Sequence, residues 1–216
     1  IEIFMNADSE FEPAFVKNMA DICKSYGMRV SSVHTMGSFT ESYHLFSSYK
    51  RRFFEAKDTS FKRHFDVMHT LGAEILVMHG IKKPGSIPDE EYFERYYKLR
   101  QVAKSMGVTL AQENVNMFRS QKPAFIKKMR EYLGDGVDFV FDIKQAVRSG
   151  NNPYDMCTAM ANRIIHLHIN DNNSTYDCML PGTGEMDYRK ILSQIKAQGF
   201  NGSAVIEVYR KNFETL

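Results

Sequence analysis

Short apolar runs alternate along the chain with longer amphipathic stretches. The runs are five or six residues long and rich in Val, Ile, Leu or Phe. This composition is typical of strands that are buried on both faces of a parallel sheet. The predicted strands are Ile1–Met5, Arg29–His34, Glu74–His79, Val108–Glu113, Val137–Asp142, Arg163–His168 and Ser203–Val208.

Between these runs, apolar residues recur at helical spacing, as Phe11, Phe15 and Met19 do in the first such stretch. Pro153 and Asp187 stand where helices are expected to begin, and such residues favour helix starts. Glycine marks the expected helix ends, where a left-handed residue is commonly needed. These glycines are Gly27, Gly72, Gly107, Gly134 and Gly199. The repeated strand–helix order predicts a parallel sheet with right-handed crossovers.

This order predicts an α/β fold of the (β/α)8 TIM-barrel class, as one domain over residues 1–216. Seven strand-like runs are visible and a closed barrel needs eight. We therefore expect the first strand to be missing from the chain, before Ile1, or to be present elsewhere with a weak signal. A doubly wound open sheet is the alternative. It is disfavoured because no GxGxxG follows the first run and no Walker-type phosphate loop occurs.

Composition narrows the function classes. Hydrophobic residues make up 43% and charged residues 25% of the chain, with a net charge of +2. No apolar run reaches the roughly 20 residues of a membrane span, and the small charge gives little support for nucleic-acid binding. Three cysteines without a CxxC favour a reducing, cytoplasmic location.

The stretch from Met36 to about Ser60 is rich in aromatic residues and is predicted to be a long loop. This loop could cover an active site or make a homo-oligomer contact.

Six of the seven predicted strands end on or beside an ionisable residue. In a parallel barrel the C-terminal strand ends point to one mouth, where active sites are built. Any one of these residues could be structural, but three acids and three histidines at one rim would repel one another without a cation. The six are His34, His79, Glu113, Asp142, His168 and Glu207. The last four form a mixed carboxylate–imidazole set that suits one divalent ion, Mn2+, Mg2+, Co2+ or Zn2+.

The ordered motifs resemble the sugar phosphate isomerase/epimerase family with xylose isomerase-like barrels. The resemblance covers essentially the whole chain and rests on a series of short segments. They are Ser32–His34, Leu76–Gly80, Leu110–Asn114, Phe139–Asp142, His166–Asp171, Pro181–Tyr188 and Ala204–Glu207. It implies a metal-dependent isomerase or epimerase that acts on a small sugar, sugar phosphate or hydroxy-keto compound through an enediolate. In ketose epimerases of this family four such residues hold one metal, which implies Glu113, Asp142, His168 and Glu207 here.

The resemblance also implies that Glu113 and Glu207 form the acid/base pair. We expect substrate-binding roles for His34, His79, Gln145 and Asp171. Gln145 stands where ketose epimerases carry a histidine, and Ser174 where they carry an arginine, which weakens a ketohexose epimerase assignment.

Three alternatives stay open. The first is a dehydratase of the inosose or dehydroshikimate type on the same barrel. The second is a barrel that binds sugar or metal without turnover. The third is a trinuclear zinc endonuclease, which the chain matches poorly because three of nine ligands are missing.

Overall fold

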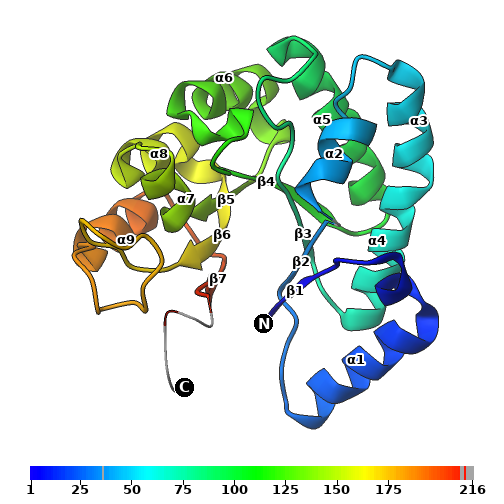
Figure 1. The fold of residues 1–216 in the computed structure, drawn as a ribbon, viewed down its shortest axis with the longest axis horizontal. Helices are drawn as coiled ribbons and strands as arrows, with labels where there is room; N and C mark the ends of the chain where they lie inside the picture. Colours follow the sequence, from blue (N-terminus) through cyan, green and yellow to red (C-terminus); the bar gives the residue numbers. More distant parts are fainter. Residues whose placement is uncertain (36, 210–211, 213–216) are drawn as a thin grey trace. The chain divides into compact units, whose positions relative to one another are not determined.

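The computed structural model describes residues 1–35, 37–209 and 212 of the chain. The fold divides into two compact units, Ile1–Gln112 and Glu113–Leu216. In Figure 1 the first unit runs from blue to green and the second from green to red. That residues 1–216 form one domain stays a prediction.

The first unit contains parallel strands that pair in chain order. They are β1 (Glu2–Phe4), β2 (Ser32–His34), β3 (Ile75–Met78) and β4 (Thr109–Glu113), whose last residue opens the second unit. The register places Phe4 beside His34, and His34 beside Val77. Strand β2 is shorter than predicted because regular pairing begins only at Ser32.

Helices of the first unit connect these strands (Figure 1). They are η1 (Asp8–Phe11), α1 (Pro13–Ser25), α2 (Ser38–His44), α3 (Lys50–Asp58), α4 (Ser60–Leu71) and α5 (Asp89–Ser105). The prediction of a loop up to about Ser60 is wrong, because α2 and α3 lie within it. Its starting residue, Met36, lies outside the described residues. The aromatic residues there are partly core residues: Phe46 and Phe53 are buried.

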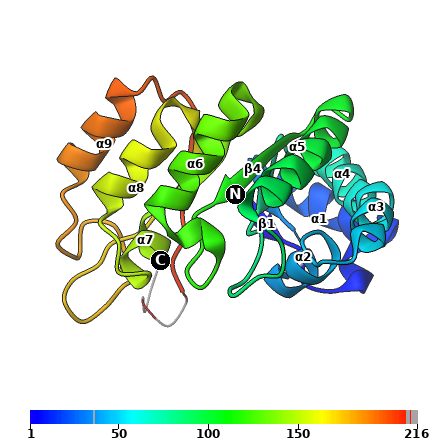
Figure 2. The same cartoon turned by 90° about the horizontal axis from the view of Figure 1, so that it is seen from above.

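The second unit repeats the strand–helix order. Its strands β5 (Phe139–Asp142), β6 (Ile164–Ile169) and β7 (Ser203–Ile206) pair in parallel, again in chain order. The register places Asp142 beside His168. Its helices are η2 (Arg119–Gln121), α6 (Pro123–Leu133), η3 (Gly134–Gly136), α7 (Ile143–Arg148), α8 (Pro153–Met160), η4 (Ala161–Arg163) and α9 (Tyr188–Ala197). Helices α6, α8 and α9 lie side by side (Figure 2).

Helix starts in the second unit follow the predicted chemistry. Pro153 is the first residue of α8, and the side chain of Asp187 accepts a hydrogen bond from the backbone N–H of Lys190, which caps α9. The interior of β5 is apolar and buried, as at Val140 and Phe141. Burial of such a side chain contributes about 1.5–3 kcal/mol. The packed strands therefore hold the residues at their C-terminal ends in fixed positions.

Candidate metal centre

Four side chains that can ligate a metal gather within the second unit. Glu113 ends β4, Asp142 ends β5, His168 lies in β6, and Glu207 directly follows β7. One ligand atom from each lies within 4.8 Å of the others. Glu113, Asp142 and His168 are buried, whereas the side chain of Glu207 is 22% exposed. The structure thus brings together the four predicted metal ligands, which we call the carboxylate–histidine cluster.

His168 is the common neighbour of the three carboxylates. Its Nδ1 lies 3.0 Å from Oε2 of Glu207, 3.4 Å from Oε1 of Glu113 and 3.7 Å from Oδ2 of Asp142. Ligands at about 2.1 Å from one ion stand roughly 3.0–3.4 Å apart in octahedral or tetrahedral geometry. Two of the three distances fall within this range and the third is 0.3 Å longer, so the spacing and the chemistry of these donor atoms fit a single divalent ion.

Hydrogen bonds from neighbouring residues orient the carboxylate of Asp142, so that one of its two oxygens points toward the cluster. Its Oδ1 accepts hydrogen bonds from Nδ2 of Asn170 at 3.1 Å and from the backbone N–H of Gln145 at 3.1 Å. Asn114 exchanges two hydrogen bonds with the Asp142 backbone, at 2.8 and 2.9 Å. The other oxygen, Oδ2, is buried and accepts no well-aligned hydrogen bond. A metal ligand is expected to be held in this way.

Lys144 is the residue of this site that sequence reasoning missed. Its side chain is fully buried, and Nζ lies 2.7 Å from Oε1 of Glu207 and 3.3 Å from Oδ2 of Asp142. Burial disfavours the charged ammonium, but the carboxylates outweigh it and raise the pKa of Lys144 above its usual range. The cluster therefore contains one permanent cation supplied by the chain.

The two carboxylates beside Lys144 differ in their titration. Burial raises the pKa of Asp142 to about 6, against the lowering effects of Lys144 and His168. Burial also works against the charged form of Glu207. There, however, the hydrogen bond and charge of His168, aided by Lys144, prevail and hold the pKa at about 2. Of these two carboxylates, Asp142 is therefore the more readily protonated and Glu207 the less readily protonated.

Gln145 and Asp171 serve local structure in the second unit. Oε1 of Gln145 accepts the backbone N–H of Asn116 at 3.0 Å. The carboxylate of Asp171 accepts backbone N–H groups of Gly182 at 2.9 Å and Met186 at 3.0 Å. Burial opposes ionisation of Asp171, but these backbone hydrogen bonds lower its pKa. The carboxylate therefore holds the glycine-rich turn, and substrate-binding roles for both residues stay predictions.

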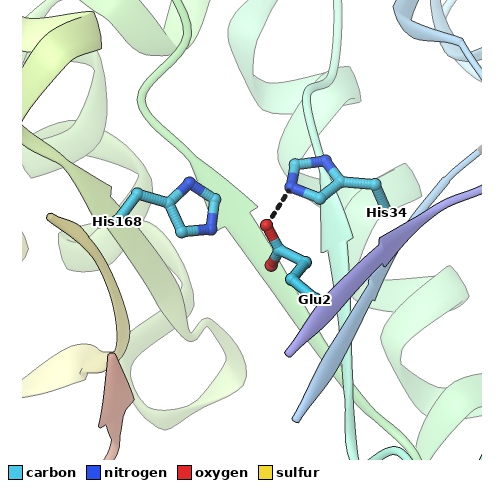
Figure 3. Close-up of side chains that lie close together, drawn as sticks. All are labelled: Glu2, His34 and His168. Atoms are coloured by element: carbon cyan, nitrogen blue, oxygen red, sulfur yellow. Dashed lines mark hydrogen bonds and ion pairs between the residues drawn. The ribbon is translucent and has the colours of Figure 1, made fainter. Parts of the chain in front are cut away.

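The first unit contains the other two predicted histidines. Nδ1 of His34 lies 3.1 Å from Nε2 of His79, and Nε2 of His34 lies 3.0 Å from Oε1 of Glu2, a contact drawn in Figure 3. The buried carboxylate of Glu41 accepts the backbone N–H groups of His79 and Gly80. The two histidines are thus linked to each other and held by carboxylates. Their part in substrate binding stays a prediction.

Two of the missed residues left a signal in the sequence. Lys144 is a cation two residues beyond the apolar run that ends at Asp142, and Glu2 is a lone acid among apolar residues of its strand. A charged residue in such a setting is rarely buried without a partner. Glu41 gave no comparable signal, because its helix was interpreted as a loop.

Comparison with known proteins identifies the fold family. The family described as xylose isomerase-like TIM barrel matches residues 1–215. The chain belongs to this family. Its fold is therefore the predicted TIM barrel and not a doubly wound open sheet, and its structural neighbours include sugar phosphate isomerase/epimerase members.

Curated relatives of this family member are similar over part of their length. The rhizopine catabolism protein MocC of Rhizobium meliloti is 26% identical over 177 residues, which cover 67% of the chain and 54% of MocC. Inosose dehydratase of Lacticaseibacillus casei is 22% identical over 191 residues, which cover 71% of the chain and 63% of that enzyme. The chain thus spans between half and two thirds of these relatives.

Solved structures confirm the fold. A D-tagatose 3-epimerase-like protein is 22% identical and superposes with a TM-score of 0.73. The match covers 96% of the present chain and 80% of that protein's chain. The IolI protein, solved with a bound zinc atom, is 20% identical and superposes with a TM-score of 0.75. This match covers 97% of the present chain and 79% of the IolI chain. At such identity the likeness concerns the fold alone.

None of the helices in the described part of the chain combines the length and the apolar character that a membrane crossing requires.

Proposed function

We propose that the protein is a divalent-metal-dependent isomerase or epimerase that acts on a small sugar, sugar phosphate or hydroxy-keto compound. The carboxylate–histidine cluster carries this proposal. It combines three carboxylates and an imidazole, largely buried, at the spacing of a single coordination sphere. Relatives and structural neighbours that modify sugars support it. Glu113, Asp142, His168 and Glu207 would hold the ion.

The proposed chemistry divides between the ion and the side chains. When bound, a divalent ion would supply a Lewis acid for a substrate carbonyl and for the negative charge that forms beside it. Glu113, at the end of β4, and Glu207, directly after β7, are proposed as the acid/base pair. One carboxylate removes a proton from the carbon beside the carbonyl, and the other returns one. Return to the opposite face of that carbon gives epimerisation, and return to the neighbouring carbon gives isomerisation.

The environments of the two glutamates suit different parts in this exchange. Glu113 is buried, whereas Glu207 is partly exposed and has a pKa of about 2. Two carboxylates whose surroundings differ are what a paired acid and base require. His34 and His79 remain the proposed groups that orient substrate oxygens.

A dehydratase is the second candidate, favoured by the similarity to inosose dehydratase. After the same removal of a proton beside the carbonyl, the β-hydroxyl would take a proton from the second carboxyl group and leave as water. The two candidates differ by product. An isomerase or epimerase conserves mass and incorporates solvent deuterium at carbon, whereas a dehydratase loses water and forms a product that absorbs ultraviolet light.

The first experiment measures bound metal by elemental analysis in the purified protein, in Glu113→Gln and in Glu207→Gln. Glu131→Gln serves as the control, because Glu131 lies on the surface of α6 and is 60% exposed. We expect one ion per chain in the wild type and the control, and loss of most of it in the two cluster variants. Ketoses, their phosphates and inososes are then screened with that ion in deuterated water.

Two outcomes would count against the proposal. A wild-type protein that binds no divalent ion, even after Mn2+, Mg2+, Co2+ and Zn2+ are added back, rules out the metal-dependent mechanism and favours a binding barrel. An ion that remains fully bound in both glutamine variants places the metal elsewhere.

A further inference from the structure

Lys144 stands inside the carboxylate–histidine cluster, although its side chain has no place in the proposed reaction. Its Nζ lies 2.7 Å from Glu207 and 3.3 Å from Asp142, at zero exposure. A fully buried lysine is uncommon unless it is paired. Here the ammonium contacts two of the four proposed metal ligands. It therefore lies beside the same carboxylate oxygens that a divalent ion would coordinate.

The charges of the cluster show what this cation does when no ion is bound. Glu113, Asp142 and Glu207 bring up to three negative charges together, and buried like charges strongly disfavour one another. Lys144 offsets one of them at hydrogen-bonding distance from Glu207. The unit can therefore fold around its carboxylates without waiting for a metal, unlike small domains that fold only with their ion.

The same cation opposes the entry of a metal. Like charges a few ångströms apart repel one another, and a divalent ion doubles the repulsion that a monovalent cation would feel. The ammonium also occupies Oε1 of Glu207 and approaches Oδ2 of Asp142. The ring of Tyr209 lies 5.3 Å from Nζ and offers a neighbouring aromatic face for the displaced cation.

We propose that Lys144 is a built-in counter-cation of the cluster. Its ammonium group lies between Asp142 and Glu207 and offsets one of their negative charges while the site is free of metal, and a divalent ion must displace it in order to bind. The inference rests on the proposed metal site and deepens it. It assigns Lys144 a role in setting metal affinity and in keeping the metal-free protein folded.

The test compares Lys144→Met, which keeps the length of the side chain and removes its charge, with wild type. Lys127→Met on α6 is the control, because Lys127 is 61% exposed and lies 3.7 Å from Glu131. Mn2+ is the probe. We expect Lys144→Met to bind Mn2+ at least tenfold more tightly in calorimetric titration. Its metal-free form should melt several degrees lower, and the control should change neither value. Weaker or unchanged Mn2+ binding would overturn the inference, because a merely structural lysine would loosen the ligands when removed.

A double-mutant cycle assigns the loss of stability to the ion pair. Lys144→Met should lower the melting temperature of the metal-free protein much less in a Glu207→Gln background than in wild type. An equal loss in both backgrounds contradicts the role as counter-cation. This measurement needs no bound metal, so it remains decisive if wild type binds no ion and the proposed function fails.

A measurement on the wild type covers the case in which Lys144→Met does not fold. Amine acylation followed by peptide mass spectrometry reports the reactivity of Lys144 with and without Mn2+. We expect saturating Mn2+ to change the acylation rate of Lys144 at least threefold while Lys127 stays constant. An unchanged rate at Lys144 overturns the displacement step.

Discussion

At the scale of single residues, hydrogen bonds decide which oxygen of Asp142 is presented to the carboxylate–histidine cluster. Nδ2 of Asn170 donates to Oδ1 at 3.1 Å, and the backbone of Gln145 donates to the same atom. These bonds restrain the carboxylate so that Oδ2 faces His168 and Lys144. Orientation by neighbours of this kind is worth about 10–100-fold in metal affinity.

Asn170→Ala is therefore expected to weaken Mn2+ binding about tenfold, because Asp142 loses one of the two donors that orient it. The control is Asn201→Ala, at an exposed position in the loop before β7. Calorimetric titration of both variants measures the effect. Unchanged affinity in Asn170→Ala would mean that the Gln145 backbone alone holds the carboxylate.

The burial of one side chain, His64 in the first unit, makes the stability of the folded protein depend on pH. Burial lowers its pKa to about 4, from 6.5, against the raising effect of its hydrogen bond to the Ser60 carbonyl at 2.9 Å. The folded protein therefore binds this proton less readily than the unfolded chain. The stability that His64 contributes is full above pH 6.5 and is lost as the pH falls toward 4.

Between pH 7 and pH 5 this linkage costs about 2 kcal/mol of unfolding free energy. His64→Gln should remove most of that loss, which urea unfolding at the two pH values measures. His69→Gln is the control, since His69 lies exposed on the same helix. A pH dependence that is the same in wild type and His64→Gln would assign the acid sensitivity to other groups.

At the scale of elements, the turn after β3 shows why a glycine is required there. Gly80 has φ of +91°, and a Cβ built on it would overlap the Tyr92 hydroxyl. Its backbone N–H also donates to the buried carboxylate of Glu41. The turn therefore has neither the backbone freedom nor the room for a side chain.

Gly80→Ala should lower the unfolding free energy by about 2–4 kcal/mol, the sum of a left-handed backbone cost and overpacking. Gly72→Ala is a matched control. Gly72 has φ of +68° but nothing within 4 Å of a built Cβ, so it should lose only about 1 kcal/mol. Urea unfolding compares the two. Equal losses would show that backbone strain alone matters at Gly80.

The strands and the gathering of four polar side chains at their ends could be predicted from the sequence, because apolar runs and strand-end charges are local features. All seven predicted strands are present, and residues at or just beyond the C-terminal ends of the last four form the cluster. The helices α2 and α3 were missed, since their aromatic residues do not follow a simple apolar stripe. Lys144 was missed for a different reason. Its burial depends on a partner, Glu207, that lies 63 positions later in the chain.

At the scale of the whole molecule, the proposed metal ligands all belong to one of the two compact units. They come from the ends of four strands between Glu113 and Glu207, within the unit Glu113–Leu216. A bound ion stabilises the folded form by RT ln(1 + [L]/Kd), about 2.7 kcal/mol when the free ion is 100-fold above its Kd. Openings that separate these strands release the ion, whereas openings confined to the first unit do not.

Hydrogen exchange with and without Mn2+ should therefore distinguish the two units. At 100-fold excess over Kd, amides of β5 and β6 are expected to exchange up to about 100-fold more slowly, because their opening requires loss of the ion. Amides of α1 and α4 should be unaffected. Glu207→Gln, which lacks a ligand, should show no protection in either unit. Equal protection in both units of the wild type would contradict this expectation, because the ion would then stabilise the chain as a single cooperative body.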